Sequence, residues 1–288
     1  MRKVSAKEQI PRPVVKWAGG KHESVDHIVR YLPSEIETYY EPFFGGGAVF
    51  FALARLGRFK RAVISDACME LVITHQAIRD DVVGVLNAIH RLGPSHVTEA
   101  KYYRIRDTKP RTPATIAARF LFLNKTGYNG LYRVNSYGKF NTPWGKHTSW
   151  SPDVENFRQV SKVLQGVEIL HADFRHVLSV ARRGDAVYLD PPYLPKSKTE
   201  KFTAYTRDGF RFERQQDLAD AFRRLVDLGV HAVASNADTR ATVRLYEDIE
   251  GTEFLRTHVS RAINSNGKGR GKVGELLIVN PGRVGEER

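Results

Sequence analysis

The string Asp190-Pro191-Pro192-Tyr193 has the residue types that can hold an exocyclic amine. It ends the apolar run 186–190, which predicts a buried strand, and parallel α/β sheets bind ligands at the carboxyl ends of their strands. Two prolines stiffen the turn because they fix φ and lack an N–H group. The Asp190 carboxylate and the Pro191 carbonyl can accept hydrogen bonds from the amine while Tyr193 stacks on its ring. The alternative is an ordinary turn that ends a strand.

A glycine-rich turn at residues 41–48 is a second candidate site. It places Gly45, Gly46 and Gly47 between a predicted strand and a predicted helix, so a ligand can approach the backbone and the free N–H groups of the helix. Asp66 follows about 20 residues later at the end of the next predicted strand, a spacing that suits a carboxylate bound to the ribose of a nucleoside cofactor. Phe50 replaces the last glycine of the dinucleotide fingerprint, which weakens a nicotinamide interpretation. A merely structural turn remains the alternative.

A third segment combines aromatic and basic side chains, as nucleic-acid-binding surfaces do. Aromatic rings can stack on bases, and cations neutralise phosphates or read guanine edges. The members are Tyr128, Tyr132, Tyr137, Phe140 and Trp144, interleaved with Lys125, Arg133, Lys139 and Lys146. Residues 133–135 and 139–141 flank Ser136-Tyr137-Gly138 and predict a β-hairpin, which fits the major groove. The alternative is an aromatic hairpin that packs on its own domain.

The elements that position these segments follow an α/β pattern. Short buried strands are predicted at residues 37–43, 62–66, 167–170, 186–190, 230–235 and 275–280, with helices between them. The middle of the chain is different, because apolar residues there recur at helical spacing. One helix is expected to start with Ser151 as N-cap and Pro152 as its first residue. We predict a split Rossmann-like α/β domain (1–67 and 166–288) with an inserted, mostly helical domain (68–165) that carries the hairpin.

Composition narrows the classes of protein. The 288 residues are 41% hydrophobic, enough for a packed core, and a net charge of +13 favours a polyanionic partner such as nucleic acid. A single cysteine, Cys68, excludes an intramolecular disulfide and multi-cysteine metal sites, and the histidines lack metal-site spacing. No apolar run is long enough for a membrane span, and the N-terminus lacks an apolar signal region. We therefore expect an intracellular protein without metal or membrane.

The chain resembles the Dam-type DNA adenine N6-methyltransferases of the D12 class over nearly its whole length. Residues 15–21 (VKWAGGK) resemble the N-terminal signature of that family, residues 41–48 its cofactor turn and residues 190–193 its catalytic motif. Residues 124–133 (NKTGYNGLYR) are similar to its DNA-recognition stretch. Shorter matches lie at 202–205, 235–236, 265–267 and 275–277. The resemblance implies a Rossmann-like methyltransferase sheet with an inserted target-recognition domain.

The resemblance also implies roles for individual residues. The catalytic residues would be Asp190, Pro191, Pro192 and Tyr193. S-adenosylmethionine would be the methyl donor, held by Trp17, Lys21, Phe44, Gly45, Gly47, Asp66, Asp173 and Asp190. Double-stranded DNA would be bound by Lys16, Tyr128, Asn129, Leu131, Arg133, Pro143 and Lys146, with GATC as the target. Lys125 and Lys146 stand where the family usually has Arg, which reads guanine better than Lys.

The expected reaction is methyl transfer by a monomer to N6 of an adenine flipped out of duplex DNA. The resemblance implies a cytoplasmic, nucleoid-associated enzyme of a bacterial or phage-infected cell. Cytosine N4, another adenine-containing site, RNA or a protein amide are alternative acceptors with similar chemistry. A DNA-binding protein without catalysis and a nicotinamide oxidoreductase are less consistent with the two motifs. Cys68 lacks the preceding proline of C5-cytosine enzymes, and no Lys-Ser or Lys-Thr ends the glycine turn, which excludes a P-loop. Lys196, Lys198, Lys201, Arg207 and Arg211 are candidates for clamping DNA over the site, and the run 267–272 has a flexible, basic composition. A mobile, solvated loop is the alternative for both segments.

Overall fold

The computed structural model describes residues 11–135, 137–193, 210–260 and 272–282. Most of the predicted basic clamp, and the short matches at 202–205 and 265–267, lie outside these residues. The described part folds around one mixed sheet of seven strands in the order β3-β2-β1-β4-β5-β7-β6. Neighbours from β3 to β5 are parallel, whereas β7 runs antiparallel to β5 and β6. The strands are β1 (Ile36–Glu41), β2 (Phe59–Asp66), β3 (Glu168–His171), β4 (Ala186–Leu189), β5 (His231–Ala237), β6 (Glu253–Ser260) and β7 (Lys272–Asn280).

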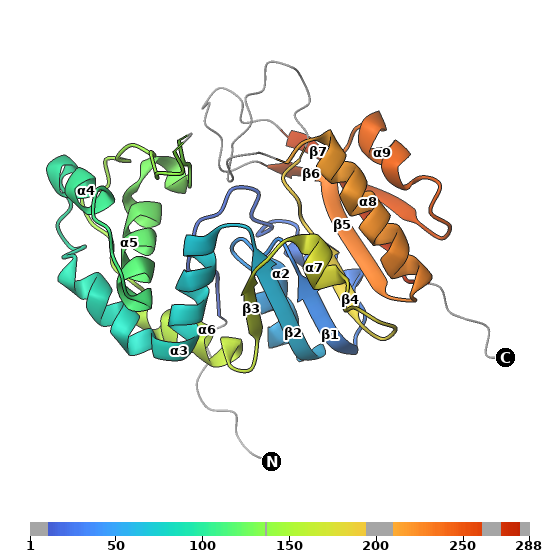
Figure 1. Cartoon of the computed structure of the whole chain (residues 1–288), viewed down its shortest axis with the longest axis horizontal. Coiled ribbons are helices and arrows are strands. Elements are labelled where there is room, and N and C mark those ends of the chain that lie inside the picture. Colours follow the sequence, from blue (N-terminus) through green and yellow to red (C-terminus); the bar gives the residue numbers. More distant parts are fainter. Residues whose placement is uncertain (1–10, 136, 194–209, 261–271, 283–288) are drawn as a thin grey trace, which may run out of the picture.

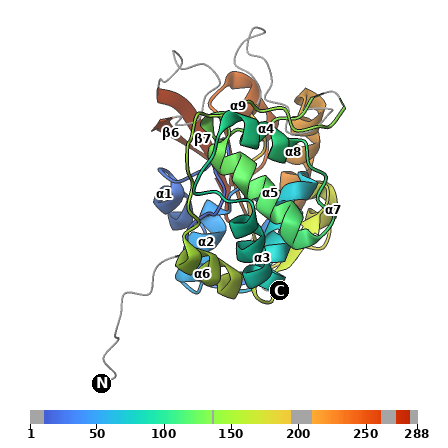
Figure 2. The same ribbon diagram turned by 90° about the vertical axis from the view of Figure 1, so that its left-hand side faces the viewer.

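Helices cover the sheet and build a separate group beside it. Figure 1 shows α3 to α6 on one side of the molecule and α8 with α9 on the other, with β1 to β4 between them. In the quarter-turned view of Figure 2, α5 crosses in front of the sheet beside α3. The helices are α1 (Val25–Arg30), α2 (Ala48–Arg55), α3 (Met69–Arg91), α4 (Glu99–Arg106), α5 (Pro113–Thr126), α6 (Val154–Leu164), α7 (Phe174–Leu178), α8 (Phe212–Asp227) and α9 (Arg240–Tyr246).

Local sequence explains where several of these elements begin. The four side chains of β4 are buried on both faces, as expected for a central parallel strand. Helix α5 begins with a capping box, in which Thr112 and Thr115 each bind the backbone of the other. The predicted start of α6 at Ser151 is wrong. Asp153 is the N-cap, and its Oδ1 accepts from the Asn156 amide at 3.1 Å, because a carboxylate satisfies the free N–H groups at a helix start.

The insertion and the sheet share a core. Ile64 of β2, Leu71 and Ile78 of α3 and Leu164 of α6 are fully buried in one apolar cluster, so the predicted boundaries at 68 and 165 pass through continuous packing. Tyr102 of α4 belongs to a smaller cluster with the end of α5. The strands that precede and follow residues 68–165 join one sheet, and the division into two domains stays a prediction.

The two predicted hairpin arms, 133–135 and 139–141, pair with each other. They meet in one antiparallel bridge, Val134–Phe140, flanked by hydrogen bonds from the Asn135 amide to the Lys139 carbonyl (2.9 Å) and from the Asn141 amide to the Arg133 carbonyl (2.9 Å). The arms are too short to form a regular ladder. The edge strand β6 and the short helices α1, α4, α7 and α9 were not predicted. Among the described residues, no helix is long and apolar enough to cross a membrane.

Candidate active site and recognition surface

The strand order brings the two predicted chemical motifs to the same edge of the sheet. β1 lies between β2 and β4, so the carboxyl ends of all three strands are adjacent. Glu41 ends β1, Asp66 ends β2 and Asp190 directly follows β4. The amino end of the antiparallel strand β7 reaches the same edge, because Glu275 pairs in register with Ala237 at the end of β5. Four carboxylates therefore come from four different strands.

A buried lysine connects two of these acids. Lys21 is only 6% exposed, and its Nζ lies 2.7 Å from Asp190 Oδ1 and 3.3 Å from Glu275 Oε1. It also donates to the Gly19 carbonyl at 2.8 Å. The Tyr193 hydroxyl donates to Glu275, and Lys21 Nζ lies 5.2 Å from the centre of the Tyr193 ring. The network fixes the aspartate and the tyrosine of the predicted catalytic motif in one arrangement.

Burial raises the pKa of Asp190 and of Glu41. It raises the pKa of Asp190 to about 6, with Lys21 acting to lower it and the Glu275 charge to raise it. Burial likewise raises the pKa of Glu41 to about 8, although the Tyr39 hydroxyl donates to it at 2.7 Å and acts in the opposite direction. The neighbouring carboxylates raise the pKa of Lys21 against the effect of its burial, so it stays charged. Among the described residues, Lys21 is the cation paired with both Asp190 and Glu275, an arrangement that favours a further positive charge nearby.

The glycine turn after β1 requires glycine at two positions. Gly45 and Gly47 have φ angles of +50° and +72°, in the left-handed region. A Cβ atom on Gly45 would lie 2.6 Å from Cδ1 of Trp17, and one on Gly47 would lie 2.3 Å from the Phe44 ring. The Asp66 carboxylate holds the turn from the neighbouring strand, since it accepts from the Gly45 amide and the Cys68 amide, each at 2.9 Å. The two glycines let Trp17 and Phe44 close over the turn.

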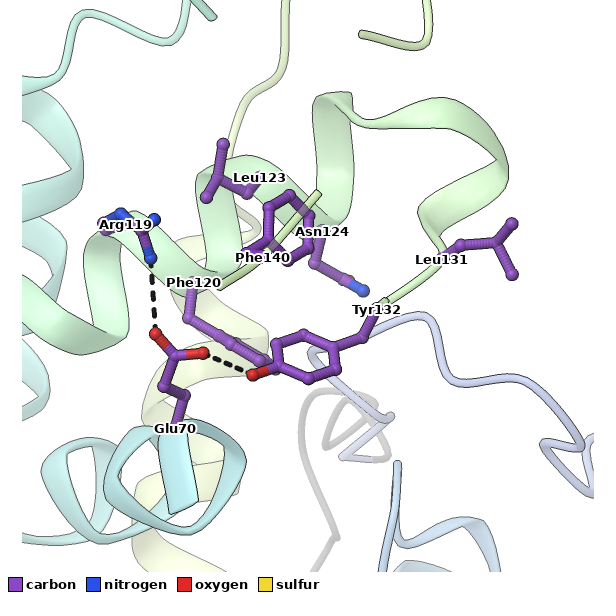
Figure 3. A pocket seen from close by; sticks show the side chains of 8 residues that line it. All are labelled: Glu70, Arg119, Phe120, Leu123, Asn124, Leu131, Tyr132 and Phe140. Carbon is purple, nitrogen blue, oxygen red and sulfur yellow. Dashed lines mark hydrogen bonds and ion pairs between the residues drawn. The ribbon is translucent and has the colours of Figure 1, made fainter. Parts of the chain in front are cut away.

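Trp17 connects the glycine turn to the inserted domain. Its indole packs on Gly45 and stacks on Tyr132 with ring centres 5.7 Å apart and an interplanar angle of 28°. The Tyr132 hydroxyl donates to Glu70 Oε2 at 2.5 Å, and Arg119 Nη1 donates to the other oxygen of Glu70 at 3.3 Å (Figure 3). Tyr132 immediately precedes Arg133, a predicted base reader. One chain of contacts thus joins the turn to the recognition segment.

Asp173, a predicted cofactor contact, already has several partners. It is the N-cap of α7 and accepts from the Arg175 amide at 3.0 Å. Its two oxygens also bind the guanidinium groups of Arg175 (2.9 Å) and Arg214. The helix-cap alternative is therefore realised, and an additional contact with the cofactor adenine stays a prediction.

The recognition segment is held together by its backbone. The Gly145 amide donates to the Thr126 carbonyl, and the Tyr128 amide donates to the Pro143 carbonyl, both at 2.9 Å. Gly127 and Trp144 form a bridge between these bonds. Among the described non-glycine residues, Asn129 and Lys146 adopt positive φ angles, +52° and +60°. Such angles cost free energy and occur often at binding sites, so this surface is a defined backbone frame.

The predicted DNA-contacting side chains differ in their exposure to solvent. Tyr128, Arg133, Pro143 and Lys146 are exposed, as is Lys16. The Lys16 backbone is fixed by the Asn124 side chain, which accepts from its amide at 2.8 Å and donates to its carbonyl at 2.7 Å. In contrast, the predicted base contact Leu131 is only 8% exposed. It borders the pocket of Figure 3, where its side chain points away from Tyr132 and Phe140. Its contact with a base stays a prediction that requires movement of the loop.

Two buried groups at the site were missed by sequence reasoning. Glu275 was noted as a family match and a strand start but not as a site residue, although a charge that begins the apolar run 276–279 was a visible signal. Gln215 of α8 is fully buried and donates from Nε2 to the Pro192 carbonyl at 2.9 Å. Its sequence gave no signal, because one glutamine in an amphipathic helix is usually exposed.

Comparison with known proteins agrees with the geometry of the site. Residues 17–263 match the family described as D12 class N6 adenine-specific DNA methyltransferase. The "Type II methyltransferase M.MjaIII" of Methanocaldococcus jannaschii is 37% identical over 288 residues, covering 93% of this chain and 99% of that protein. The "DNA adenine methylase" of Escherichia coli K12 is 35% identical over 280 residues, covering 95% and 97%.

Among solved structures, an rRNA methylase from Streptococcus thermophilus has a TM-score of 0.37 and 10% identity, covering 96% of this chain and 99% of that chain. A TM-score this low does not by itself establish a shared fold. The sequence matches are decisive: the chain belongs to the D12 class of N6 adenine-specific DNA methyltransferases. It is an adenine-specific DNA methyltransferase with a methyltransferase-like α/β fold, which confirms the family and the enzyme class expected from the motifs.

Proposed function

We propose that this enzyme transfers a methyl group from S-adenosylmethionine to N6 of a flipped-out adenine in double-stranded DNA, at GATC sites. The observation that carries the proposal is the joint placement of Asp190, Tyr193 and Lys21 at the carboxyl ends of the central strands. Asp190 and the Pro191 carbonyl would accept hydrogen bonds from the adenine amine, with Pro192 stiffening the turn and Tyr193 stacking on the base.

The described residues fit the proposed cofactor. The left-handed Gly45 and Gly47 open the backbone of the turn, and Trp17, Phe44 and Asp66 surround it. The surplus of carboxylates around Lys21 suits a ligand that carries positive charge. When bound, S-adenosylmethionine supplies the methyl group on its sulfonium. Trp17, Lys21, Phe44, Gly45, Gly47, Asp66, Asp173 and Asp190 are the proposed contacts.

The adenine amine is a weak nucleophile because its lone pair is delocalised into the ring. Hydrogen bonds from N6 to Asp190 and to the Pro191 carbonyl would favour a pyramidal nitrogen aimed at the methyl group. Asp190 must be ionised to serve as a charged acceptor and to stay paired with Lys21. It does not need to be a strong base, since the nitrogen loses its proton readily once it is methylated and cationic.

Recognition of the target is assigned to the inserted domain. Flipping an adenine out of the stack costs a few kcal/mol, which phosphate and base contacts would offset. Arg133 is proposed to read guanine, with Lys16, Leu131, Pro143 and Lys146 as further DNA contacts. Tyr128 and Asn129 would act near the flipped adenine. The exposure of Tyr128 and Arg133 on a fixed backbone frame supports this assignment.

Transfer of labelled methyl groups to two short duplexes tests the proposal. One duplex carries GATC, and the other carries GTTC with a matching second strand. We expect label in the first duplex alone, recovered as N6-methyladenine after digestion to nucleosides. Recovery of N4-methylcytosine would show that cytosine, and not adenine, accepts the methyl group. Equal label in both duplexes would contradict the GATC assignment. No transfer to either duplex, despite binding of S-adenosylmethionine, would reject the proposed substrate.

A further inference from the structure

Two buried side-chain amides lie behind the catalytic motif. Asn236 of β5 and Gln215 of α8 are 1% and 0% exposed, respectively. Asn236 Nδ2 donates to Gln215 Oε1 at 2.9 Å, and Gln215 Nε2 donates to the Pro192 carbonyl at 2.9 Å. Buried polar groups cost free energy unless they are hydrogen-bonded. Apolar side chains would fill these positions without that cost, so the two amides point to a role for their hydrogen bonds.

The direction of this hydrogen-bond chain is fixed at both ends. At one end, the Ala237 amide can only donate, and it donates to Asn236 Oδ1 at 2.8 Å. At the other end, the Pro192 carbonyl can only accept. The amide nitrogen of Gln215 must therefore face Pro192, and that of Asn236 must face Gln215. Neither side chain can turn over without losing two hydrogen bonds.

The position of the contact is unusual for a turn. Pro191 and Pro192 have no N–H group, so the backbone between Asp190 and Tyr193 can be held there only through its carbonyls. Gln215 binds the carbonyl of Pro192, which belongs to the same peptide unit as the nitrogen of Tyr193. The orientation of this peptide determines how the Tyr193 ring and the Pro191 carbonyl are presented.

We propose that Gln215 is a positioning residue for methyl transfer, and that Asn236 orients its amide. The two side chains hold the Asp190–Tyr193 turn in the geometry that accepts the adenine amine. This inference rests on the proposed function of that turn. A purely structural role, in which Gln215 only fills space on the buried face of α8 beside Leu218, is the competing explanation.

The first test replaces the amide with an apolar side chain of similar length. Gln215→Met removes the donor to Pro192, and Gln216→Met is the matched control, because Gln216 is the exposed neighbour on the same helix. We expect the single-turnover rate of Gln215→Met to fall about 10–100-fold, as for a small misplacement of reacting groups, with binding of duplex and S-adenosylmethionine within about threefold of the parent enzyme. The control should keep the parent rate. A parent-like rate for Gln215→Met would overturn the proposal.

A second variant remains informative if Gln215→Met does not fold. Gln215→Glu keeps the shape of the side chain, and its protonated carboxyl group can still donate to Pro192, whereas the ionised form repels that carbonyl. The rate of Gln215→Glu divided by that of the parent enzyme should therefore fall as pH rises. A ratio that is independent of pH, or a combined loss of rate and of duplex binding, would indicate a structural role and overturn the proposal.

Asp190→Asn separates failure of this inference from failure of the proposed function. If the parent enzyme transfers methyl groups and Asp190→Asn does not, the turn is the catalytic site and the Gln215 variants test the positioning role alone. If Asp190→Asn remains as active as the parent, the proposed site itself is wrong, whatever the Gln215 variants show.

Discussion

The edge of the sheet and the recognition surface use charge in opposite ways. At the sheet edge, Lys21 is 6% and Asp190 is 19% exposed, and they are paired at 2.7 Å. On the recognition surface, Arg133 and Lys146 are exposed, and Tyr137 at the tip of the hairpin is 85% exposed. The proposed catalytic groups are thus held by contacts with one another, whereas the proposed recognition surface exposes its side chains, with Arg133 Nε donating to Asn141 Oδ1 at 2.8 Å.

This difference predicts two classes of variants. Changes at the sheet edge should lower the rate of methyl transfer without changing which DNA is bound. Changes on the recognition surface should alter the choice of DNA while the chemical step is retained. Trp17 and Tyr132 stack on each other between the two regions, so changes there should affect both the rate and the choice of DNA.

Asp190→Ala should have the largest effect. Loss of the carboxylate removes an acceptor of the adenine amine and the partner of Lys21, so we expect the single-turnover rate to fall roughly 10²–10⁴-fold, the range for removal of a catalytic group. Affinity for duplex DNA should stay within a few-fold in a gel-shift titration. Asp220→Ala, at an exposed position on α8, is the control and should keep full activity. Retained turnover in Asp190→Ala would refute the role of Asp190.

Arg133→Ala should reduce discrimination between duplexes. Loss of a bidentate contact with guanine costs about 1–3 kcal/mol of specificity. We expect the ratio of transfer to GATC and to a duplex with one changed base pair to fall about 5–150-fold, which is that free energy expressed as a ratio. Lys139→Ala, on the opposite arm of the hairpin, should weaken binding to both duplexes and keep the ratio. Equal effects of the two variants would argue against base reading by Arg133.

Gly45→Ala should weaken cofactor binding. A side chain at φ +50° costs about 1–2 kcal/mol, and its Cβ atom would also displace Trp17. Gly57→Ala is the matched control, because Gly57 has a φ of +64° but nothing within 4 Å of a new Cβ atom. Both variants should lose thermal stability, but only Gly45→Ala should lose affinity for S-adenosylmethionine in a calorimetric titration. Normal affinity in Gly45→Ala would place the cofactor elsewhere.

Glu275→Gln should have the smallest effect, a shift in the pH profile. Asp190 is a charged acceptor only when ionised, and burial raises its pKa to about 6, so the rate of the parent enzyme should fall as pH drops through about 6. The charge of Glu275 helps to raise this pKa, so its removal should move the acid limb to lower pH, while the amide oxygen of the introduced side chain still accepts from Tyr193. Glu253→Gln, at an exposed position, should leave the profile unchanged. An acid limb that moves to higher pH would contradict this electrostatic account.

The two regions were not equally predictable from the sequence. The strands 62–66 and 186–190 were recognisable from short apolar runs, and the ends of these strands located Asp66 and Asp190. Sequence separation hid the contact between Lys21 and Glu275, which come from opposite ends of the chain and meet only because β7 inserts antiparallel beside β5. Resemblance to the family selected the expected recognition residues, but it did not indicate that Tyr132 and Leu131 are buried whereas Tyr128 is exposed, because packing determines burial.

The most direct test of this division of labour measures two variants in one assay. Parent enzyme, Asp190→Asn and Arg133→Ala are each given a GATC duplex and a duplex with one changed base pair, and both binding and single-turnover methyl transfer are recorded. We predict that Asp190→Asn loses transfer to both duplexes but keeps the parent ratio of affinities, whereas Arg133→Ala retains transfer and loses the ratio. If Asp190→Asn instead changed the ratio, or if Arg133→Ala abolished transfer to both duplexes at saturating DNA, the assignment of chemistry to the sheet edge and of recognition to the insertion would be contradicted.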